Sequence, residues 1–402
     1  MTNPIIDAEK RVCADNYLPL PVVLEKGDGV KLWDTQGREY LDMMGAYSAV
    51  SFGHSNPDLL AALNKQAQQL AVVSRAYYTP ELGPFLQKLC QMTGQEKALP
   101  MNTGAEAVET ALKAARKWGY KVKGIADNKA EIIACHNNFH GRTISIVGLS
   151  SEAQYRDGFG PFPAGLKRIP FNDVDALKKA ITKNTCAFLV EPIQGEGGII
   201  VPDDGYLSAC KSLCEQNDVL MICDEVQTGL GRTGYLLACE HDAVKPDGLI
   251  LGKALGGGLL PVSAFLSSQQ VMDVFTPGDH GSTFGGNPLA SAVGHKVLEL
   301  LSDVTLMPKI QALGAYFMDQ LKTIESPLIV DIRGRGLFIG VEIDASKVSG
   351  RQLCERLLEK GVLSKETHES VIRFAPPFVV TKPEIDKVCA VFQQALTELS
   401  LD

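Results

Sequence analysis

Short, uninterrupted apolar runs alternate with helix-like stretches through the middle of this 402-residue chain. Because the apolar runs do not alternate with polar residues, they are typical of strands buried on both faces of a mainly parallel sheet. Strands that alternate with helices predict an α/β domain with helices on both faces of that sheet. The expected strands are residues 131–135, 187–190, 219–223, 248–251 and 262–266, and the expected helices are residues 58–73, 105–120, 205–215 and 287–302.

The pattern changes from about Leu289. Long helix-like stretches then flank two strand-like runs, residues 336–343 and 371–374, and a final amphipathic stretch follows Pro383. A chain of this length is too long for one small core. The expected division is an N-terminal segment over residues 1–45 that packs with the small domain, a large domain over residues 46–288, and a small α+β domain over residues 289–402.

Composition narrows the possible partners. The formal net charge of −8 gives no electrostatic reason to expect nucleic acid or an anionic membrane as a partner. The most apolar stretch, residues 248–266, is interrupted by glycines, a proline and Lys253, so no membrane span is expected. The N-terminal residues lack the basic start and apolar core of a secretory signal. We therefore expect a cytoplasmic protein.

The 10 cysteines are expected to be reduced thiols that pack in the core. Those in or beside apolar runs are Cys135, Cys186 and Cys223. Cys210 and Cys214 are four residues apart in an expected helix, and a zinc pair is the alternative there, but no matching His/Cys pair follows. His136 and His140 share that spacing without a third ligand. No metal site is expected.

Two expected strands end in charged residues that could bind a cofactor or take part in catalysis. The run 219–223 ends in Asp224 and Glu225. A carboxylate in an apolar pocket is costly unless it is paired, and a pyridinium N–H is a suitable partner that the anion keeps protonated. Lys253 follows another apolar run and precedes a row of glycines; a partly desolvated lysine can form an imine with an aldehyde cofactor. The plainer alternatives are a capping or salt-bridged carboxylate and a solvated turn lysine.

Two further strand ends could complete such a site. Thr103, Gly104 and Ala105 form a small-residue turn that opens a helix, where free N–H groups and the helix dipole would bind a phosphate. Phe139 follows a strand and could stack on a planar ring, and Arg142 could bind a carboxylate bidentately. In an α/β sheet, ligands bind beyond the carboxyl ends of the strands. The four segments together predict one site at that edge.

With these segments in this order, the chain resembles a class III aminotransferase of the fold-type-I pyridoxal-phosphate (PLP) superfamily, over roughly residues 16–383. The resemblance implies a large domain with a mainly parallel seven-stranded sheet flanked by helices, a smaller α+β C-terminal domain, PLP as cofactor, and a homodimer with shared active sites. The telling segments are NYLPLP from Asn16, AYSAV from Ala46, MNTGAEAVET from Met101, ARKWGY from Ala115, EPIQGE from Glu191, DEVQTG from Asp224, HGSTFGGNP from His280 and IRFAPP from Ile372.

The resemblance implies a role for each matching position. Lys253 would hold the cofactor as an imine and move a proton between substrate and cofactor, and Asp224 would pair with the ring nitrogen. The remaining cofactor-binding positions are Gln227 at the ring hydroxyl, Phe139 on the ring face, Thr103, Gly104 and Ala105 at the phosphate, and Ser282 and Thr283 at the phosphate of the neighbouring subunit.

Within that class the tyrosine segments are most similar to those of ornithine aminotransferases. This likeness implies transfer of the δ-amino group of L-ornithine to 2-oxoglutarate by a ping-pong route, giving glutamate 5-semialdehyde and glutamate, in proline biosynthesis or arginine metabolism. Tyr17 and Tyr47 would line the ornithine pocket, and Arg142 would bind a substrate carboxylate. Arg373 would bind the 2-oxoglutarate carboxylate, with Glu196 covering it while ornithine is bound.

Two positions depart from the pattern of eukaryotic ornithine aminotransferases. His140 stands where those enzymes tend to have tryptophan, and Leu18 where they tend to have histidine; a Phe-His-Gly-Arg-Thr segment is common in acetylornithine aminotransferases. N-acetylornithine, 4-aminobutyrate or lysine are therefore the alternative amino donors. A non-catalytic PLP-fold binding protein is the alternative from another class, but such a protein would be expected to lose Lys253 or Asp224.

Overall fold

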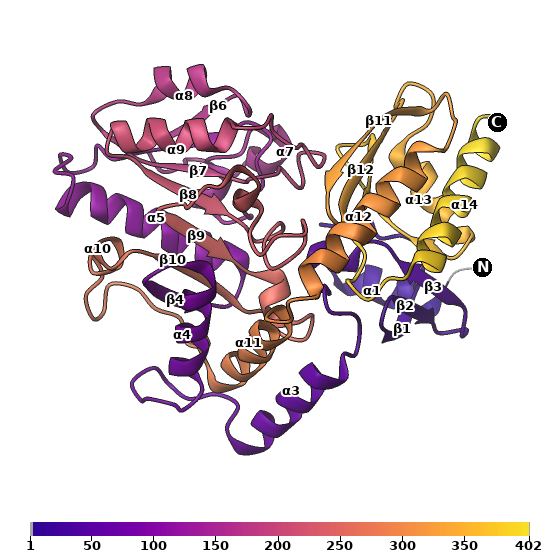
Figure 1. The fold of residues 1–402 in the computed structure, drawn as a ribbon, viewed down its shortest axis with the longest axis horizontal. Helices are drawn as coiled ribbons and strands as arrows, with labels where there is room; N and C mark the ends of the chain where they lie inside the picture. Colours follow the sequence, from indigo (N-terminus) through magenta and orange to yellow (C-terminus); the bar gives the residue numbers. More distant parts are fainter. Residues whose placement is uncertain (1–2, 402) are drawn as a thin grey trace.

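The computed structural model describes residues 3–401 and is built around a seven-stranded sheet in the order β4-β10-β9-β8-β7-β5-β6 (Figure 1). All its neighbouring strands pair in parallel except β10, which is antiparallel to both β9 and β4. The mainly parallel seven-stranded sheet is thus confirmed. The strands are β4 (Lys97–Met101), β5 (Glu131–Cys135), β6 (Leu166–Ile169), β7 (Thr185–Val190), β8 (Leu220–Asp224), β9 (Gly248–Leu251) and β10 (Ser263–Ser267).

Successive side chains of the central strands enter two different cores, which explains their uninterrupted apolar runs. On β5, Ile133 and Cys135 join one buried cluster while Ile132 and Ala134 join the other. Side chains of a strand alternate between the two faces of its sheet, so both faces of this sheet are buried. Burial on both faces does not reveal strand direction, which is why the run at 262–266 gave no sign of its antiparallel course.

Helices cover the two faces separately. The helix α5 (Gly104–Lys121) packs Ala111 and Trp118 into one cluster, and α9 (Tyr206–Gln216) packs Leu207 and Cys210 into the other. Cys214, on the same face of α9, is fully buried with them. Further helical segments of this part are α6 (Ile144–Val147), α7 (Ala153–Arg156), α8 (Val174–Ala180), α10 (Gln269–Met272) and the 3₁₀ turns at Ala238–Asp242 and Lys253–Gly256.

A second, antiparallel sheet in the order β11-β12-β15-β14 forms the small C-terminal part at the right of Figure 1. Its strands are β11 (Ile329–Arg335), β12 (Phe338–Ile343), β14 (Lys365–Thr367) and β15 (Val371–Phe374), and its helices are α12 (Leu306–Lys322), α13 (Gly350–Glu359) and α14 (Lys382–Leu399). The sequence pattern identified β12 and β15 but missed β11 and β14. The expected strand at 336–343 begins too early, because Gly336 has a positive φ of 57° and forms the turn before β12.

The N-terminal strands share a sheet with a C-terminal strand. The sheet has the order β1-β2-β3-β13, and β13 (Val362–Leu363) runs parallel to β3. Its other members are β1 (Leu24–Asp28), β2 (Lys31–Asp34) and β3 (Glu39–Asp42). The remaining helices are α1 (Pro4–Val12), α2 (Gly45–Ser48), α3 (Pro57–Gln69), α4 (Leu82–Thr93) and α11 (Pro288–Leu301). The expected helix at 58–73 is too long, because Leu70 has extended φ/ψ angles that end α3. The division of the chain at residues 45 and 288 stays a prediction.

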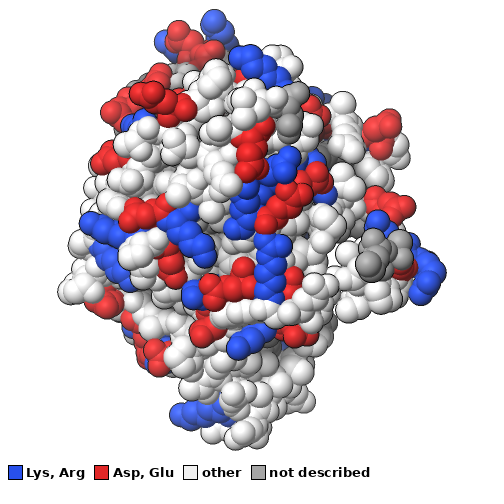
Figure 2. Space-filling view, turned by 90° about the vertical axis from the view of Figure 1, so that its right-hand side faces the viewer, with Lys and Arg blue, Asp and Glu red and all other residues white. Residues whose placement is uncertain are grey.

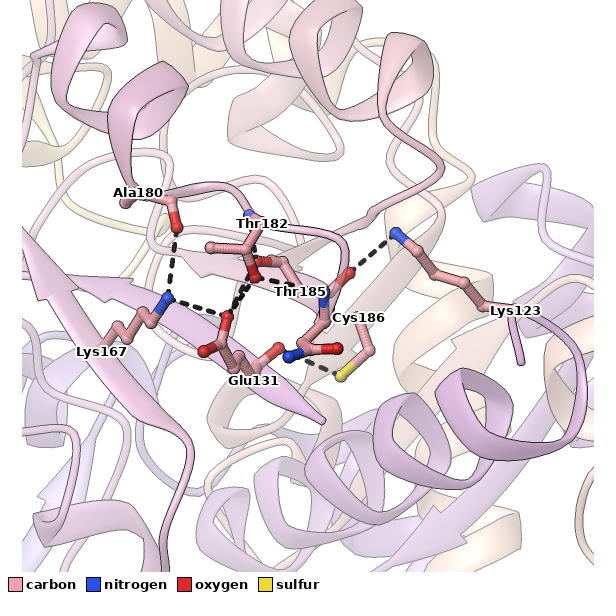
Figure 3. Close-up of polar contacts among 8 residues, drawn as sticks. Lys123, Glu131, Lys167, Ala180, Thr182, Thr185 and Cys186 are labelled. Carbon is pink, nitrogen blue, oxygen red and sulfur yellow. Dashed lines mark hydrogen bonds and ion pairs between the residues drawn. The ribbon is translucent and has the colours of Figure 1, made fainter. Parts of the chain in front are cut away.

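A polar network occupies the amino ends of β5 and β7 (Figure 3). The Glu131 carboxylate accepts hydrogen bonds from Lys167 Nζ at 2.8 Å and from Thr182 Oγ1 at 2.6 Å. Lys123 Nζ donates to the main-chain carbonyls of Thr185 and Asn217, each at 2.9 Å. These bonds satisfy polar groups at the edge opposite the carboxyl ends of the strands.

Figure 2 shows the face of the small part, where acidic and basic side chains are intermixed. Ion pairs along and between α13 and α14 include Arg356–Glu359 at 3.1 Å and Lys360–Glu398 at 2.7 Å. Exposed pairs of this kind contribute about 0–1 kcal/mol each. No helix within residues 3–401 is both long and apolar enough to cross a membrane.

Two glycines allow close packing within the small part and between the small part and the large part. A Cβ on Gly314 of α12 would overlap the backbone of Gly336, and a Cβ on Gly336 would overlap the backbone of Thr233. Neither neighbour is a flexible side chain that could move aside. The helix, the β11–β12 turn and the loop after β8 therefore approach one another only because both positions lack a side chain.

We expect Gly314→Ala to destabilise the fold by about 1–3 kcal/mol through this overlap, although alanine is the better helix former. Gly83→Ala in α4 is the matched control, because an added Cβ there meets nothing within 4 Å. Thermal unfolding should give a lower midpoint for the first variant and an equal or higher one for the second. An unchanged midpoint for Gly314→Ala would refute the close approach.

Candidate active site

A cavity of about 160 Å³, here called the inner cavity, lies at the carboxyl edge of the large sheet. It brings together residues from all four predicted segments. Its lining includes Gly104, Ala105, Phe139, His140, Glu191, Asp224, Gln227 and Lys253. A more open cavity of about 650 Å³, the outer cavity, is lined by Glu196, Tyr155, Arg351 and Glu366 among others. A hydrogen bond of 3.2 Å from Gln227 Nε2 to Glu196 Oε1 links the linings of the two cavities.

Lys253 lies two residues after the end of β9 and lines the inner cavity from a left-handed backbone position, with φ 45°. Non-glycine residues rarely adopt this conformation, and such strain is concentrated at functional sites. Desolvation lowers the pKa of the Lys253 amine to about 8, although the charge of Glu196 acts in the opposite direction. The residue is thus a desolvated amine rather than a solvated turn lysine.

The two adjacent carboxylates at the end of β8 have different surroundings. Asp224 lines the inner cavity; its Oδ2 lies 2.7 Å from His140 Nδ1, and its Oδ1 accepts from the Val226 N–H at 3.1 Å. Glu225 instead accepts from the main-chain N–H groups of Ala238 at 3.0 Å and Cys239 at 2.8 Å. Glu225 therefore holds the following loop, and Asp224 is the carboxylate available to a ligand.

The start of α5 has a capping box. Thr103 Oγ1 accepts from the Glu106 N–H at 3.2 Å, and the Glu106 carboxylate accepts from the Thr103 N–H at 2.8 Å. The next two residues, Gly104 and Ala105, line the inner cavity, and their N–H groups donate to no acceptor among residues 3–401. The first N–H groups of a helix have no partner inside it and attract anions. These residues therefore fit a phosphate group.

A buried ion pair joins the large sheet to the small one. Glu196 follows β7, Arg373 lies on β15, and their side chains form two parallel bonds, Nη1–Oε1 and Nη2–Oε2, each of 2.8 Å. Arg373 is 1% exposed. Burial raises the pKa of Glu196, but the opposite charge of Arg373 outweighs burial and brings that pKa to about 2. Gln227 joins the pair, since its Oε1 also accepts from Arg373 Nη1 at 3.3 Å.

Tyr47 lies above this ion pair on a strained turn. Its ring centroid is 5.2 Å from Arg373 Cζ and 5.6 Å from Lys253 Nζ. All four residues of Gly45–Ser48 have positive φ angles, between 47° and 75°. Left-handed backbone costs roughly 1–2 kcal/mol for each non-glycine residue. The turn must therefore be held by its surroundings.

Two buried residues hold that turn. The Asp42 carboxylate accepts from the Gly45 N–H at 2.9 Å. Ser51 Oγ donates to the Ser48 carbonyl at 2.9 Å and accepts from Arg232 Nη2 at 2.8 Å. Arg232 also donates to the carbonyl of Leu337 at 3.1 Å, so the turn is tied to the small part.

The other predicted residues lie outside the inner cavity. Tyr17 is 76% exposed. Arg142 is exposed and stacks on Tyr155, with its Cζ 3.5 Å from the ring centroid. Thr283 is exposed, and Ser282 Oγ accepts from Asn102 Nδ2 at 2.8 Å.

Sequence reasoning missed Glu191. Its carboxylate is buried and accepts from the N–H groups of Phe139 at 2.9 Å and Gly195 at 3.2 Å. Burial raises the pKa of Glu191 to about 7. The signal was available, because Glu191 ends an apolar run in a carboxylate, as Asp224 does.

Comparisons with known proteins agree with this site. The family model described as Aminotransferase class-III matches residues 12–396. An ornithine aminotransferase 2 of Staphylococcus aureus is 55% identical, covering 97% of this chain and 98% of that protein. The ornithine aminotransferase of Bacillus subtilis is 54% identical over 95% of this chain and 94% of its own length.

Solved structures of both candidate kinds of aminotransferase are similar to this chain. The ornithine aminotransferase from Toxoplasma gondii, whose description mentions PLP at its active site, has a TM-score of 0.97 at 44% identity and covers 99% of this chain and 94% of that one. An acetylornithine aminotransferase from Elizabethkingia anophelis has a TM-score of 0.88 at the same 44% identity, with 98% of each chain covered. At equal sequence identity, this backbone follows the first structure more closely.

We expect the Lys253 amine of the cofactor-free protein to become reactive as the pH rises through about 8, because only the neutral amine is nucleophilic. At pH 7 the neutral fraction of the Lys253 amine would be about one tenth. For an ordinary lysine the neutral fraction at this pH is on the order of three in ten thousand. Trace acetylation at a series of pH values, followed by peptide mass spectrometry, measures this directly. The same peptide in urea is the control and should keep gaining reactivity to higher pH. A folded-state curve that matches the urea curve would contradict desolvation.

Proposed function

The chain belongs to the class-III aminotransferase family, and from this premise we propose that it transfers the δ-amino group of L-ornithine to 2-oxoglutarate with PLP as cofactor. The products are glutamate 5-semialdehyde, which cyclises, and glutamate, formed in two half-reactions of a ping-pong cycle. The observation that carries the proposal is the buried Glu196–Arg373 pair beside Tyr47 and Lys253.

The inner cavity fits the cofactor by the chemistry of its donors. When bound, PLP supplies an aldehyde carbon for the amino group and a ring that accepts the electron pair released at the neighbouring carbon. Asp224 is the anion that would hold the proton of the ring nitrogen. The N–H groups of Gly104 and Ala105 would hold the phosphate, with Thr103 at the start of the same helix. Phe139 would contact the ring face, and Gln227 would bond the ring hydroxyl.

Lys253 is the residue that would carry the proton during the reaction. Its amine reaches the inner cavity, and its lowered pKa leaves a neutral fraction at physiological pH. A neutral amine can take a proton from the substrate carbon, and the resulting ammonium can return it. Groups with a pKa near the working pH carry protons most efficiently in both directions.

The ion pair explains how one site could accept two different substrates. Ornithine must present its δ-amino group, whereas glutamate presents its α-amino group. A free Arg373 would attract the α-carboxylate of ornithine and bring the wrong amine to the cofactor. Pairing with Glu196 cancels that attraction, worth a few kcal/mol in a partly desolvated site. For 2-oxoglutarate, Glu196 would move away and leave Arg373 to the substrate carboxylate.

Three further residues complete the proposed substrate pocket. Tyr47 would offer its hydroxyl to the free α-amino group of ornithine, and Tyr17 would close the pocket. Arg142 is exposed and stacked on an aromatic ring, which leaves its guanidinium N–H groups for a carboxylate. Stacking also fixes the orientation of that planar group.

A homodimer is part of the proposal. Ser282 and Thr283 would reach the phosphate bound by the neighbouring subunit. Phe284, which follows Thr283, is 54% exposed, and Arg75 lies against Gly286. Tyr77, two residues after Arg75, is 67% exposed. Exposed apolar groups of this kind mark protein interfaces. The cytoplasmic location and the role in proline biosynthesis or arginine metabolism stay predictions.

The deciding experiment compares turnover with 2-oxoglutarate and three amino donors: L-ornithine, N-acetylornithine and 4-aminobutyrate. Trapping the cyclised semialdehyde as a coloured adduct identifies the ornithine product. A clear preference for ornithine is expected. Preference for N-acetylornithine would keep the cofactor chemistry and overturn the substrate, and a protein that stays colourless with added PLP would instead favour the non-catalytic alternative.

Lys253→Ala should abolish both turnover and the visible absorption of the lysine-linked cofactor, because no other amine takes its place at the strand end. Lys245→Ala, on the loop before β9, is the control and should leave both unchanged. Full activity of the Lys253 variant would contradict its role.

Tyr47→Phe should lower the kcat/KM for ornithine by about tenfold or more, since one hydrogen bond to a charged group is lost. Use of 4-aminobutyrate should fall far less, because that substrate has no α-amino group for the hydroxyl to bind. Parallel kinetics with both donors test the difference. Equal losses would count against a bond between the Tyr47 hydroxyl and ornithine.

A further inference from the structure

The loop that carries Ser282 packs against the end of β4. A Cβ on Gly285 would lie 2.7 Å from the Pro100 carbonyl oxygen, and a Cβ on Gly286 would lie 2.8 Å from Pro100 Cγ. Both distances are shorter than ordinary van der Waals contact, so the loop can come this close only because the two positions lack side chains. Ser282 is thereby placed beside Asn102, the residue that follows β4.

The Ser282 hydroxyl accepts two hydrogen bonds. Asn102 Nδ2 donates to Ser282 Oγ at 2.8 Å, and the Gly285 N–H donates to the same oxygen at 3.1 Å. A serine hydroxyl has two acceptor lone pairs and one O–H donor. Both lone pairs are thus occupied, and the O–H has no acceptor among residues 3–401. The bond that remains to Ser282 is donation to an acceptor from outside this part of the chain, such as a phosphate oxygen.

Glu106 fixes the orientation of the Asn102 amide. Its Oε2 accepts from the main-chain N–H groups of Asn102 at 2.9 Å and Thr103 at 2.8 Å, and its Oε1 lies 3.4 Å from Asn102 Nδ2. If the amide turned over, its carbonyl oxygen would face this carboxylate, and neither of the two oxygens can donate a proton. The amide therefore keeps its NH₂ group toward Glu106 and toward Ser282.

This network lies between two proposed phosphate contacts. Glu106 closes the capping box of α5, whose first N–H groups would hold the phosphate of the same subunit. Ser282 would instead reach the phosphate of the neighbouring subunit. A hydroxyl without fixed partners rotates freely, and it would then donate in no set direction. The Asn102 amide removes that freedom, so its effect should fall on the cofactor of the other subunit.

We propose that Asn102 is a positioning residue for the cofactor of the neighbouring subunit: it occupies a lone pair of Ser282 Oγ and so directs the O–H toward that phosphate. The inference rests on the proposed function, because it assumes that PLP binds in the inner cavity of a homodimer. Asn102 precedes the capping residue of its own phosphate-binding helix, yet it governs how tightly the other subunit retains PLP.

The first measurement is the dissociation constant of PLP, by dialysis and absorbance. Ser282→Ala should weaken binding by about tenfold or more, as expected for loss of a bond to a charged group, and Asn102→Ala by about threefold or more. The double variant should bind within about twofold of Ser282→Ala, since coupled residues are not additive. The same loss from Asn102→Ala in both backgrounds would overturn the proposal. Asn217→Ala is the control, because its Nδ2 donates at 2.8 Å to the Leu213 carbonyl, far from the cavity.

Hybrid dimers of differently tagged chains show which subunit is affected. Lys253→Ala in one chain removes the absorption of the lysine-linked cofactor from that chain, so one site is observed. With Asn102→Ala in the same chain as Lys253→Ala, the observed site should bind PLP as weakly as the Asn102→Ala homodimer does.

With the two changes in different chains, the observed site receives Ser282 from a chain that keeps Asn102, and it should bind PLP as in a hybrid that carries Lys253→Ala alone. The reverse pattern, or equal binding in the two hybrids, would overturn the proposal. A wild type that is monomeric or binds no PLP would refute the proposed function itself, whatever the variants do.

Discussion

The bidentate ion pair between Glu196 and Arg373 holds the carboxyl edge of the large sheet against the small antiparallel sheet. The Arg373 side chain is 1% exposed and that of Glu196 is 22% exposed, and an isolated charge as buried as Arg373 would cost several kcal/mol. Two parallel bonds, the amide of Gln227 and the ring of Tyr47 offset that cost. The pair therefore depends on both sheets being in place, and the substrate side of the site exists only in the assembled fold.

Most other charges at the site also have a partner, and the exception is the reactive one. Asp224 has His140, and Glu191 has two main-chain N–H donors. Lys253 has no hydrogen-bonded counter-charge among residues 3–401, so desolvation lowers its pKa to about 8. A paired lysine would keep its proton and could not attack an aldehyde. The pairing of its neighbours thus leaves one amine free to act as a nucleophile.

The sequence predicted the parts of the fold that burial controls directly. Strands buried on both faces leave uninterrupted apolar runs, so the central strands could be predicted from the pattern. The roles of Asp224 and Lys253 came from the family resemblance and stay predictions, whereas the family comparison confirmed the cofactor class. The strands β11 and β14 are half-buried and polar, and they gave no such signal. Side-chain direction was also inaccessible: His140 lies toward Asp224, and Tyr47 lies on a left-handed turn, because contacts distant in sequence hold both. The pattern of apolar runs alone did not distinguish Asp224 from Glu225; the choice of Asp224 came from the family resemblance.

The strength of the ion pair between Glu196 and Arg373 restricts how the site can change between its two substrates. With the pKa of Glu196 at about 2 and that of Arg373 raised, neither partner loses its charge at physiological pH. Protonation therefore cannot open the pair, and neither charge can be left alone in the pocket without a large penalty. What can replace Glu196 on Arg373 is another carboxylate in the same bidentate geometry. 2-Oxoglutarate brings such a group, and the exchange keeps the arginine paired while Glu196 turns toward the more open outer cavity that it already lines. Ornithine has a carboxylate too, but its δ-amino group can reach the cofactor only if that carboxylate stays away from Arg373. The same ion pair can thus bind 2-oxoglutarate when the substrate carboxylate replaces Glu196 on Arg373. It can orient ornithine when Glu196 and Arg373 stay paired.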